Sequence, residues 1–485
     1  MASGRRAIAA IATFLGILGT VTCSASNGET IPLRSLTPPS VTAPGAGQLT
    51  YGIGAPGIGD PDFPTDGNGG YDVDRYRLRI DYDPGSRHLS GVTAIEAKAT
   101  QDLTRFNLDL RGFEVSRITV DGSAARFERD QDELTVIPAR PISDRAGFTV
   151  TVTYAGEPQP VRGSSNLGTY GFIPTDDGAF VACQPNGAKT WFPSNDHPAD
   201  KARYDFEITV PAGLTALANG ELVSAPKTAG GKTTFLWRES HPMASYLATA
   251  TLGRFELRQG TTPGGIPNLT AVDPRFHSAL DSLYTQSGRI TDYWSTVFGP
   301  YPFSSTGGVI DDFTAGYALE NQTKPQYGGF TPDSSIIAHE LAHQWFGDSL
   351  TITRWRDLWL NEGFATYAEW LWSEHEGGST VETTFRNHYA AAPDAAIWKY
   401  TPGRAQPADL FNDSVYTRGG MALHALRQRI GDPVFFNLLK TWNTEHKYGY
   451  VTTEEFVALA EKLSGKKLDK LFNVWLFTAE KPTDW

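Results

Sequence analysis

Cysteine is nearly absent from this sequence, which has only two in 485 residues, Cys23 and Cys183. Cys23 lies in an N-terminal apolar stretch, so a chain that has lost this stretch keeps Cys183 alone. A single cysteine cannot form an intramolecular disulfide, and a chain of this length can bury enough apolar surface to be stable without one. The composition therefore excludes a small disulfide-stabilised scaffold.

An excess of positive charge is also lacking, because 42 Lys and Arg stand against 54 Asp and Glu, a formal net charge of −12. This balance argues against nucleic acid as a partner. No apolar run is long enough to span a membrane comfortably: the longest, residues 7–22, is short for a bilayer. We therefore predict a chain without a transmembrane span.

The same N-terminal run has the layout of a secretion signal. Arg5 and Arg6 precede it, and small and polar residues follow. We predict a signal over residues 1–25 and a secreted, extracellular protein. The alternative is a lipid anchor on Cys23, which would make a cell-surface lipoprotein. Residues 26–66 are rich in Pro, Gly and Ser and are predicted to be a flexible leader.

Short alternating apolar and polar runs dominate residues 67–258, as in residues 76–82, 148–152 and 204–210. Period-two patterning with β-branched and aromatic residues is typical of β-strands. Turn sequences such as Asp121-Gly122 separate the runs. We predict an antiparallel β sandwich or saddle of about a dozen strands. After Gly264-Gly265 the period becomes helical, and the second domain is predicted over residues 259–485, so the whole chain is predicted to be α+β.

Two histidines stand four residues apart on a predicted helix that starts near Thr331-Pro332-Asp333, with Glu340 between them. Residues four apart share one helix face, so His339 and His343 can bind one metal ion. The alternative is a helix with surface histidines. A catalytic zinc ion also needs a third protein ligand and an open fourth position.

Glu362 follows at a distance that allows a loop and a second helix. We predict one Zn²⁺ per chain, held by His339, His343 and Glu362. Glu340 would face the open position and take a proton from zinc-bound water. Glu369 lies on the same helix face as Glu362 and is predicted either to hold a zinc histidine in place or to be a solvated glutamate.

These residues resemble the gluzincin zinc aminopeptidases, the family of alanyl aminopeptidases and leukotriene hydrolases. The resemblance covers about residues 60–480 and rests on the two histidines, Glu340, and Glu362 within Asn-Glu-Gly-Phe-Ala. It implies a thermolysin-like, mainly α-helical catalytic domain over residues 259–485 and peptides with a free N-terminus as substrates. Many relatives carry a further helical domain that closes over the site, and this chain is expected to lack it.

The resemblance also implies a site for the substrate's amine. Residues 316–321 are similar to the family's exopeptidase motif, with Tyr317 in the usual glycine position. Within this motif Ala318, Glu320 and Asn321 are expected to bind substrate, with Glu320 pairing the ammonium. Gln184 occupies a position where many relatives have a glutamate, and its amide oxygen would accept from the same ammonium.

A last similar segment surrounds Tyr416, in Val-Tyr-Thr-Arg-Gly. The resemblance implies that the Tyr416 phenol stabilises the oxyanion formed during peptide hydrolysis. The leading interpretation is a secreted zinc aminopeptidase. Two alternatives remain: a zinc endopeptidase with an open cleft, and an inactive homologue that binds peptides. The complete catalytic set argues against the inactive homologue, because a binding protein needs no general base.

Overall fold

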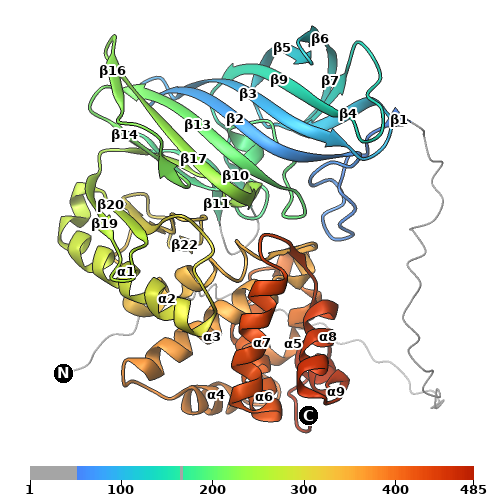
Figure 1. Cartoon of the computed structure of the whole chain (residues 1–485), viewed down its shortest axis with the longest axis vertical. Coiled ribbons are helices and arrows are strands. Elements are labelled where there is room, and N and C mark those ends of the chain that lie inside the picture. Colours follow the sequence, from blue (N-terminus) through green and yellow to red (C-terminus); the bar gives the residue numbers. More distant parts are fainter. Residues whose placement is uncertain (1–51, 164–167) are drawn as a thin grey trace, which may run out of the picture. The chain divides into compact units, whose positions relative to one another are not determined.

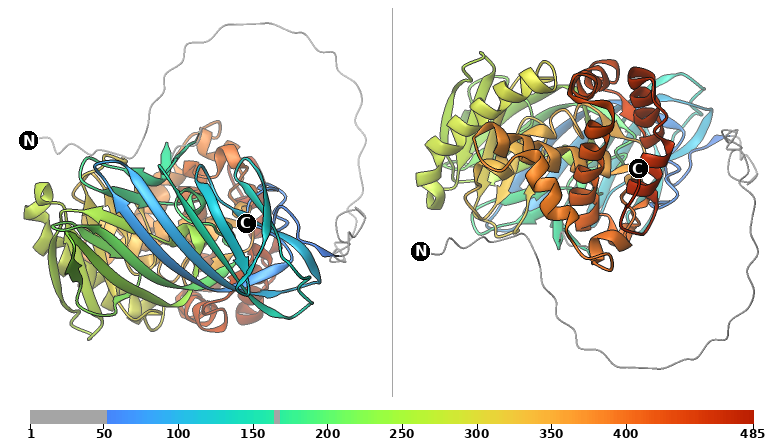
Figure 2. Two further views of the ribbon diagram at one scale, coloured as in Figure 1. Left: turned by 90° about the horizontal axis from the view of Figure 1, so that it is seen from above. Right: turned by 90° about the horizontal axis from the view of Figure 1, so that it is seen from below.

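The N-terminal part of the chain is built from strands and the C-terminal part mainly from helices. The computed structural model describes residues 52–163 and 168–485, which belong to one compact unit, Gly52–Trp485. In Figure 1 the strands of the β domain, coloured blue to green, lie above the helices, coloured yellow to red. The views from above and below in Figure 2 show these two layers in turn. The predicted α+β class, with a β domain followed by a helical domain, is confirmed.

One large sheet forms the outer layer of the β domain. Its strands follow the order β15 (Glu221–Leu222), β17 (Lys232–Ala244), β13 (Lys201–Pro211), β2 (Tyr71–Asp83), β3 (His88–Ala99), β9 (Gly147–Gly156), β5 (Glu114–Val120) and β6 (Ser123–Ala124), with β16 (Lys227–Ala229) also paired to β17. The three strands predicted at residues 76–82, 148–152 and 204–210 are confirmed as β2, β9 and β13. Neighbouring strands of this sheet are antiparallel, as predicted, except β13 and β2, which run parallel.

Two smaller sheets cover the inner face of the large one. They follow the orders β1 (Gly52–Ile53), β4 (Leu103–Asp109), β8 (Glu133–Ile137), β7 (Arg126–Asp130), and β10 (Val161–Arg162), β11 (Thr169–Pro174), β12 (Ala179–Ala182), β18 (Ala250–Gly253), β14 (Thr215–Ala218). Aromatic side chains pack between the layers: Tyr71 of β2 lies 5.7 Å from Phe106, and Tyr82 lies 5.0 Å from Phe172, between ring centroids. The alternating apolar residues of β2 therefore form one wall of the core.

The helical domain begins with a mixed sheet in the order β19 (Glu256–Thr261), β20 (Pro267–Val272), β21 (Thr306–Asp311), β23 (Gln326–Gly328), β22 (Ala318–Leu319). Because β19 starts at Glu256, this sheet begins slightly before the predicted boundary at residue 259. In the described part of the chain the α-helices of this domain are α1 (Leu280–Val297), α2 (Ser334–Ala342), α3 (Trp359–His375), α4 (Val381–Tyr389), α5 (Ala396–Lys399), α6 (Gly419–Ile430), α7 (Asp432–Glu445), α8 (Thr453–Ser464) and α9 (Asp469–Phe472). A short strand, β24 (Thr351–Ile352), pairs with β25 (Tyr450–Val451). Among the described residues, no helix has the length and apolar character needed to cross a bilayer.

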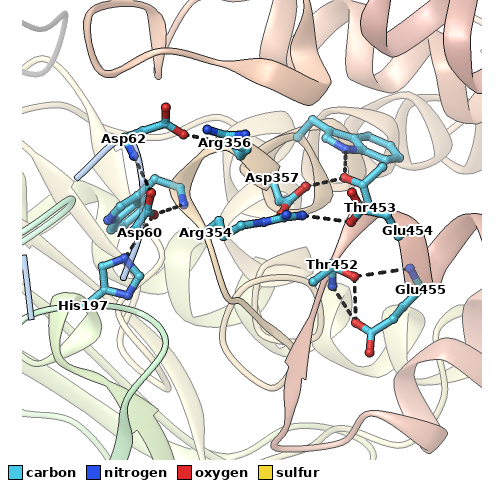
Figure 3. Close-up of polar contacts among 12 residues, drawn as sticks. Asp60, Asp62, His197, Arg354, Arg356, Asp357, Thr452, Thr453, Glu454 and Glu455 are labelled. Atoms are coloured by element: carbon cyan, nitrogen blue, oxygen red, sulfur yellow. Dashed lines mark hydrogen bonds and ion pairs between the residues drawn. The ribbon is translucent and has the colours of Figure 1, made fainter. Parts of the chain in front are cut away.

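Residues 52–66 are tied to the rest of the fold, so the prediction of a flexible leader is wrong for this part. The predicted signal, Cys23 and residues 26–51 lie outside the described residues. Asp60 is 3% exposed and accepts hydrogen bonds from the Trp355 backbone N–H (2.9 Å) and the His197 ring (3.2 Å). Asp62 pairs with Arg356 at 2.6 Å. Figure 3 shows the contact of Asp60 with His197 and that of Asp62 with Arg356, beside Arg354 and Asp357, just before α3 begins.

These hydrogen bonds also control the ionisation of Asp60. Burial by itself would raise the pKa of this carboxyl, but hydrogen bonds from His197, Trp355 and Asp62 lower it to about 2. Asp60 is therefore ionised at neutral pH, and its charge is compensated inside the fold.

We expect Asp60→Ala to lower the free energy of unfolding by about 1–3 kcal/mol, because the buried Trp355 N–H loses its acceptor. Urea denaturation would measure this change. Asp81→Ala is the control, since Asp81 makes a solvent-exposed pair with Lys232, and such pairs contribute about 1 kcal/mol or less. Equal losses in the two variants would contradict the structural role given to Asp60.

Candidate active site

Helix α2 presents the two histidines. It begins at Ser334, where Asp333 is the N-cap and its carboxylate accepts from the N–H groups of Ser335 and Ile336. The helix thus starts directly after the predicted segment Thr331-Pro332-Asp333, because a carboxylate that reaches two free N–H groups is a strong cap. His339 and His343 follow on one face, with ring centroids 4.8 Å apart.

Both imidazoles point toward one carboxylate. The Nε2 atoms of His339 and His343 each lie 3.3 Å from Oε2 of Glu362, in the first turn of α3. The ligand atoms of all three residues lie within 4.8 Å of one another. All three residues are buried: the solvent-exposed fraction is 6% for His339, 1% for His343 and 3% for Glu362. The structure thus brings together the three residues predicted as zinc ligands.

The other ring nitrogens are held by hydrogen bonds. Nδ1 of His339 lies 2.7 Å from Glu369 Oε1, and Nδ1 of His343 lies 3.0 Å from the Phe346 carbonyl. Ser335 donates to the second oxygen of Glu369. A carboxylate or carbonyl on Nδ1 fixes the ring and leaves Nε2 free for a metal. Glu369 therefore lies where the first of its two predicted roles requires, against a zinc histidine.

The cluster suits a divalent cation. Two imidazole nitrogens and one carboxylate oxygen are the donors of a catalytic zinc site. Burial alone would lower the pKa of His343, but Glu362 and Glu320 raise it to about 9. Burial alone would raise the pKa of Glu362, but the two histidines lower it to about 2. Without a metal, protons on the imidazoles balance the carboxylates, and a cation can take their place.

Glu340 lies beside this donor set. Its carboxylate is within 4.8 Å of ligand atoms of His343 and Glu320. Burial raises its pKa to about 8, against the opposing effect of the two histidines. A carboxyl group with a pKa near neutrality can both accept and return a proton. The structure thus puts Glu340 next to the candidate metal position, as predicted from the helix spacing.

Tyr416 reaches the site through a close contact between two helices. A Cβ on Gly363 of α3 would lie 3.0 Å from the backbone of Gly419 in α6, so a side chain there would push the two helices apart by a few tenths of an ångström. A π-helical turn, Ser414–Arg418, leads into α6 and carries Tyr416. Its ring lies 6.3 Å from the His339 ring, and burial with the nearby carboxylates raises its pKa well above the usual value. The phenol therefore remains a proton donor at neutral pH.

The structure brings together only some of the residues predicted to bind substrate. Ala318 lies in β22, the last strand of its sheet in the described part of the chain. Glu320 is 2% exposed, and the Gln184 amide donates to it at 3.0 Å. Asn321 instead donates to the Leu247 carbonyl at 2.9 Å. Glu320 and Gln184 thus lie together as predicted, whereas the Asn321 amide nitrogen faces the β domain.

Sequence reasoning missed Gln344. Its amide nitrogen donates to the Glu320 carbonyl at 3.1 Å, and its oxygen accepts from the Thr323 N–H at 2.8 Å. The available signal was a polar residue directly after His343, among the apolar side chains of residues 341–346. His424 contacts Glu382 and Tyr367 and belongs to none of the candidate metal groups among the described residues.

Comparison with protein-family models assigns both domains to one family. Residues 72–247 match the peptidase M1 N-terminal domain, and residues 330–475 match the peptidase family M1 domain. The chain belongs to peptidase family M1. This confirms the resemblance inferred from the histidine motif, because the family is that of the zinc aminopeptidases.

Relatives in the family M1 include long and short proteins. Aminopeptidase M1-B of Oryza sativa subsp. japonica is 27% identical over 82% of this chain and 49% of its own length. Aminopeptidase N of Lactococcus lactis is 25% identical over 83% of this chain and 50% of its own. The chain thus spans about half the length of these curated relatives.

One solved structure is similar to this chain over nearly its whole length. It is a mutant of the M1 zinc metallopeptidase from Deinococcus radiodurans bound to a Tyr-Ser-Ala substrate. It has 27% identity and a TM-score of 0.79, and the match covers 88% of this chain and 99% of the other. Another similar structure is a two-domain M1 zinc metallopeptidase bound to L-tryptophan, with a TM-score of 0.79.

We expect the purified family M1 chain to bind close to one zinc per molecule and His343→Ala to lose most of it, because one of three ligands is gone. Atomic absorption after dialysis would measure the metal. His424→Ala is the matched control, since His424 is also buried and also contacts a glutamate. Full zinc content in His343→Ala would contradict the assignment.

Proposed function

We propose that the chain is a zinc-dependent aminopeptidase that removes N-terminal residues from peptides. One observation carries this proposal: the carboxylates of Glu320 and Glu340 and a ring nitrogen of His343 lie within 4.8 Å of one another. The amine nitrogen and carbonyl carbon of a single residue are about 2.5 Å apart, from standard bond lengths and angles. An amine bound at Glu320 therefore leaves room for one residue before the scissile bond.

Burial gives the amine site its selectivity. The Glu320 carboxylate is shielded from water, and burial raises its pKa. An ammonium ion can replace the lost solvation by a charge-assisted hydrogen bond, whereas an acetylated nitrogen cannot. The Gln184 nitrogen is already bonded to Glu320, so the Gln184 oxygen is left to accept from the same ammonium. Binding energy is thus available only to substrates with a free N-terminus.

The chain's own residues would divide the remaining chemistry. Zinc, when bound by His339, His343 and Glu362, supplies a Lewis acid for peptide hydrolysis. Glu340 takes a proton from the attacking water and returns it to the leaving amine. The Tyr416 phenol donates a hydrogen bond to the carbonyl oxygen as negative charge develops there. Glu369 and the Phe346 carbonyl keep the two histidine rings in orientation.

We also infer that the protein is exported. The support is in the sequence, where Arg5 and Arg6 precede an apolar run that is followed by small and polar residues. The alternative, a lipid anchor at Cys23, also rests on this N-terminal sequence. Mass spectrometry of the N-terminus of the protein from its native source distinguishes a cleaved soluble chain from a lipid-modified cysteine.

We expect Glu340→Gln to keep zinc but to lower kcat by about 10⁴-fold, because the amide cannot accept the proton. Tyr416→Phe should lower kcat by about 10²–10³-fold with little change in KM, as loss of one oxyanion donor does. Steady-state kinetics on an aminoacyl amidocoumarin, with metal analysis, would measure both. Near-normal turnover of a zinc-loaded Glu340→Gln protein would contradict the mechanism.

A peptide with a free N-terminus should be cut much faster than its acetylated twin. Glu320→Ala should reduce kcat/KM by about 10²–10³-fold, because a buried charged partner is removed, whereas Gln184→Ala should cost about 10-fold or less. Product analysis by mass spectrometry would measure both peptides. If the acetylated peptide is cut at a similar rate, the protein is an endopeptidase; if chelator-sensitive cleavage of either peptide is absent, it is a peptide-binding homologue.

A further inference from the structure

The turn that follows Glu320 has an unfavourable backbone conformation. Residues 321–324 form the turn, closed by a hydrogen bond of 2.8 Å from the Lys324 N–H to the Asn321 carbonyl. Thr323 within it has a φ of +64°. A β-branched residue rarely adopts this left-handed region, and such a conformation persists only where surrounding contacts hold it. The contacts around Thr323 therefore matter for the position of the neighbouring Glu320.

Two residues from distant parts of the chain hold Thr323. Its N–H donates to the Gln344 side-chain oxygen at 2.8 Å, and its hydroxyl accepts from the Gly220 N–H at 2.7 Å. Thr323, Gln344 and Gly220 are all buried. Water therefore offers no replacement for either hydrogen bond, and loss of one leaves a buried N–H unpaired.

The Gln344 amide contacts both sides of this turn. Its oxygen accepts from Thr323, and its nitrogen donates to the Glu320 carbonyl at 3.1 Å. Gln344 follows His343 directly, and its own N–H bonds to the Leu341 carbonyl at the end of α2. One side chain thus connects the helix that carries the metal ligands to the residue expected to bind the amine.

We propose that Gln344 is a positioning residue that fixes the separation between the Glu320 carboxylate and the metal-binding histidines. It would thereby set the register in which the first residue of a peptide is bound. The inference rests on the proposed function, in which Glu320 binds the ammonium. Because the amine and the scissile carbonyl of a substrate have a fixed covalent separation, a shift of about 1 Å in Glu320 can cost about 10²-fold.

A pair of inhibitors can measure this separation without turnover. Leucine hydroxamate and its des-amino analogue, 4-methylpentanohydroxamate, share a metal-binding group and an alkyl side chain and differ only in the amine. The ratio of their dissociation constants, measured by calorimetry on the zinc-loaded protein, reports how well the amine is placed. We expect the wild-type protein to bind the amino compound at least about 30-fold more tightly, through a charge-assisted hydrogen bond to Glu320.

Gln344→Met should reduce that ratio to about 3-fold or less while the affinity for the des-amino compound and the zinc content stay within about 2-fold of wild type. Methionine has a similar length and no amide, so the buried volume is nearly kept. Gln326→Met is the matched control, since Gln326 is also fully buried and its amide also bonds to two partners, Thr249 and Thr251. This control should lose a similar amount of thermal stability and keep the wild-type ratio.

The outcomes separate the two proposals. A wild-type ratio near 1 would contradict Glu320 as the amine site and hence the proposed aminopeptidase. A high wild-type ratio that survives in Gln344→Met would overturn the positioning role alone. An equal fall in Gln344→Met and Gln326→Met would also overturn it, because general loosening of the sheet would then explain the loss.

Discussion

Three carboxylates and two imidazoles share one buried volume at the end of α2, and the surrounding structure depends on balancing their charges. Glu320, Glu340 and Glu362 are all shielded from water, and unpaired buried charges cost several kcal/mol each. Protons on the histidines can balance part of this charge, and a divalent cation can balance more of it. Exclusion of water also strengthens every remaining electrostatic interaction there, so the arrangement that favours a metal cation also favours binding of a substrate's ammonium.

The metal ligands could be predicted from the sequence because their geometry is local. The helix period alone puts His339 and His343 on one face, and a loop of ordinary length returns Glu362 to them. The strands of the β domain were likewise visible from their alternation, as β2 shows with its buried aromatic and aliphatic side chains. The positions of Glu320 and Tyr416 came instead from resemblance to a family, since neither has a distinctive spacing from the histidines.

The remaining features depend on contacts between distant residues. Asp60 and Trp355 are 295 positions apart, and no local pattern in a Pro- and Gly-rich segment reveals that pairing. Gln344 likewise acts through backbone groups of Glu320 and Thr323, which any residue type provides. The close contact of Gly363 with Gly419 requires knowing that α3 and α6 touch. Side chains that bond to a distant backbone leave no signature in a single sequence.

The anchored position of Asp60 limits how far the N-terminus can be shortened. Trimming that stops before Gly52 keeps every contact among residues 52–163 and 168–485. Cleavage beyond Asp60 would strip the acceptor from the Trp355 N–H and from His197, at the turn that precedes α3. Because α3 begins with the segment that carries Glu362, removal of only these few residues would loosen the turn that leads to one of the candidate metal ligands.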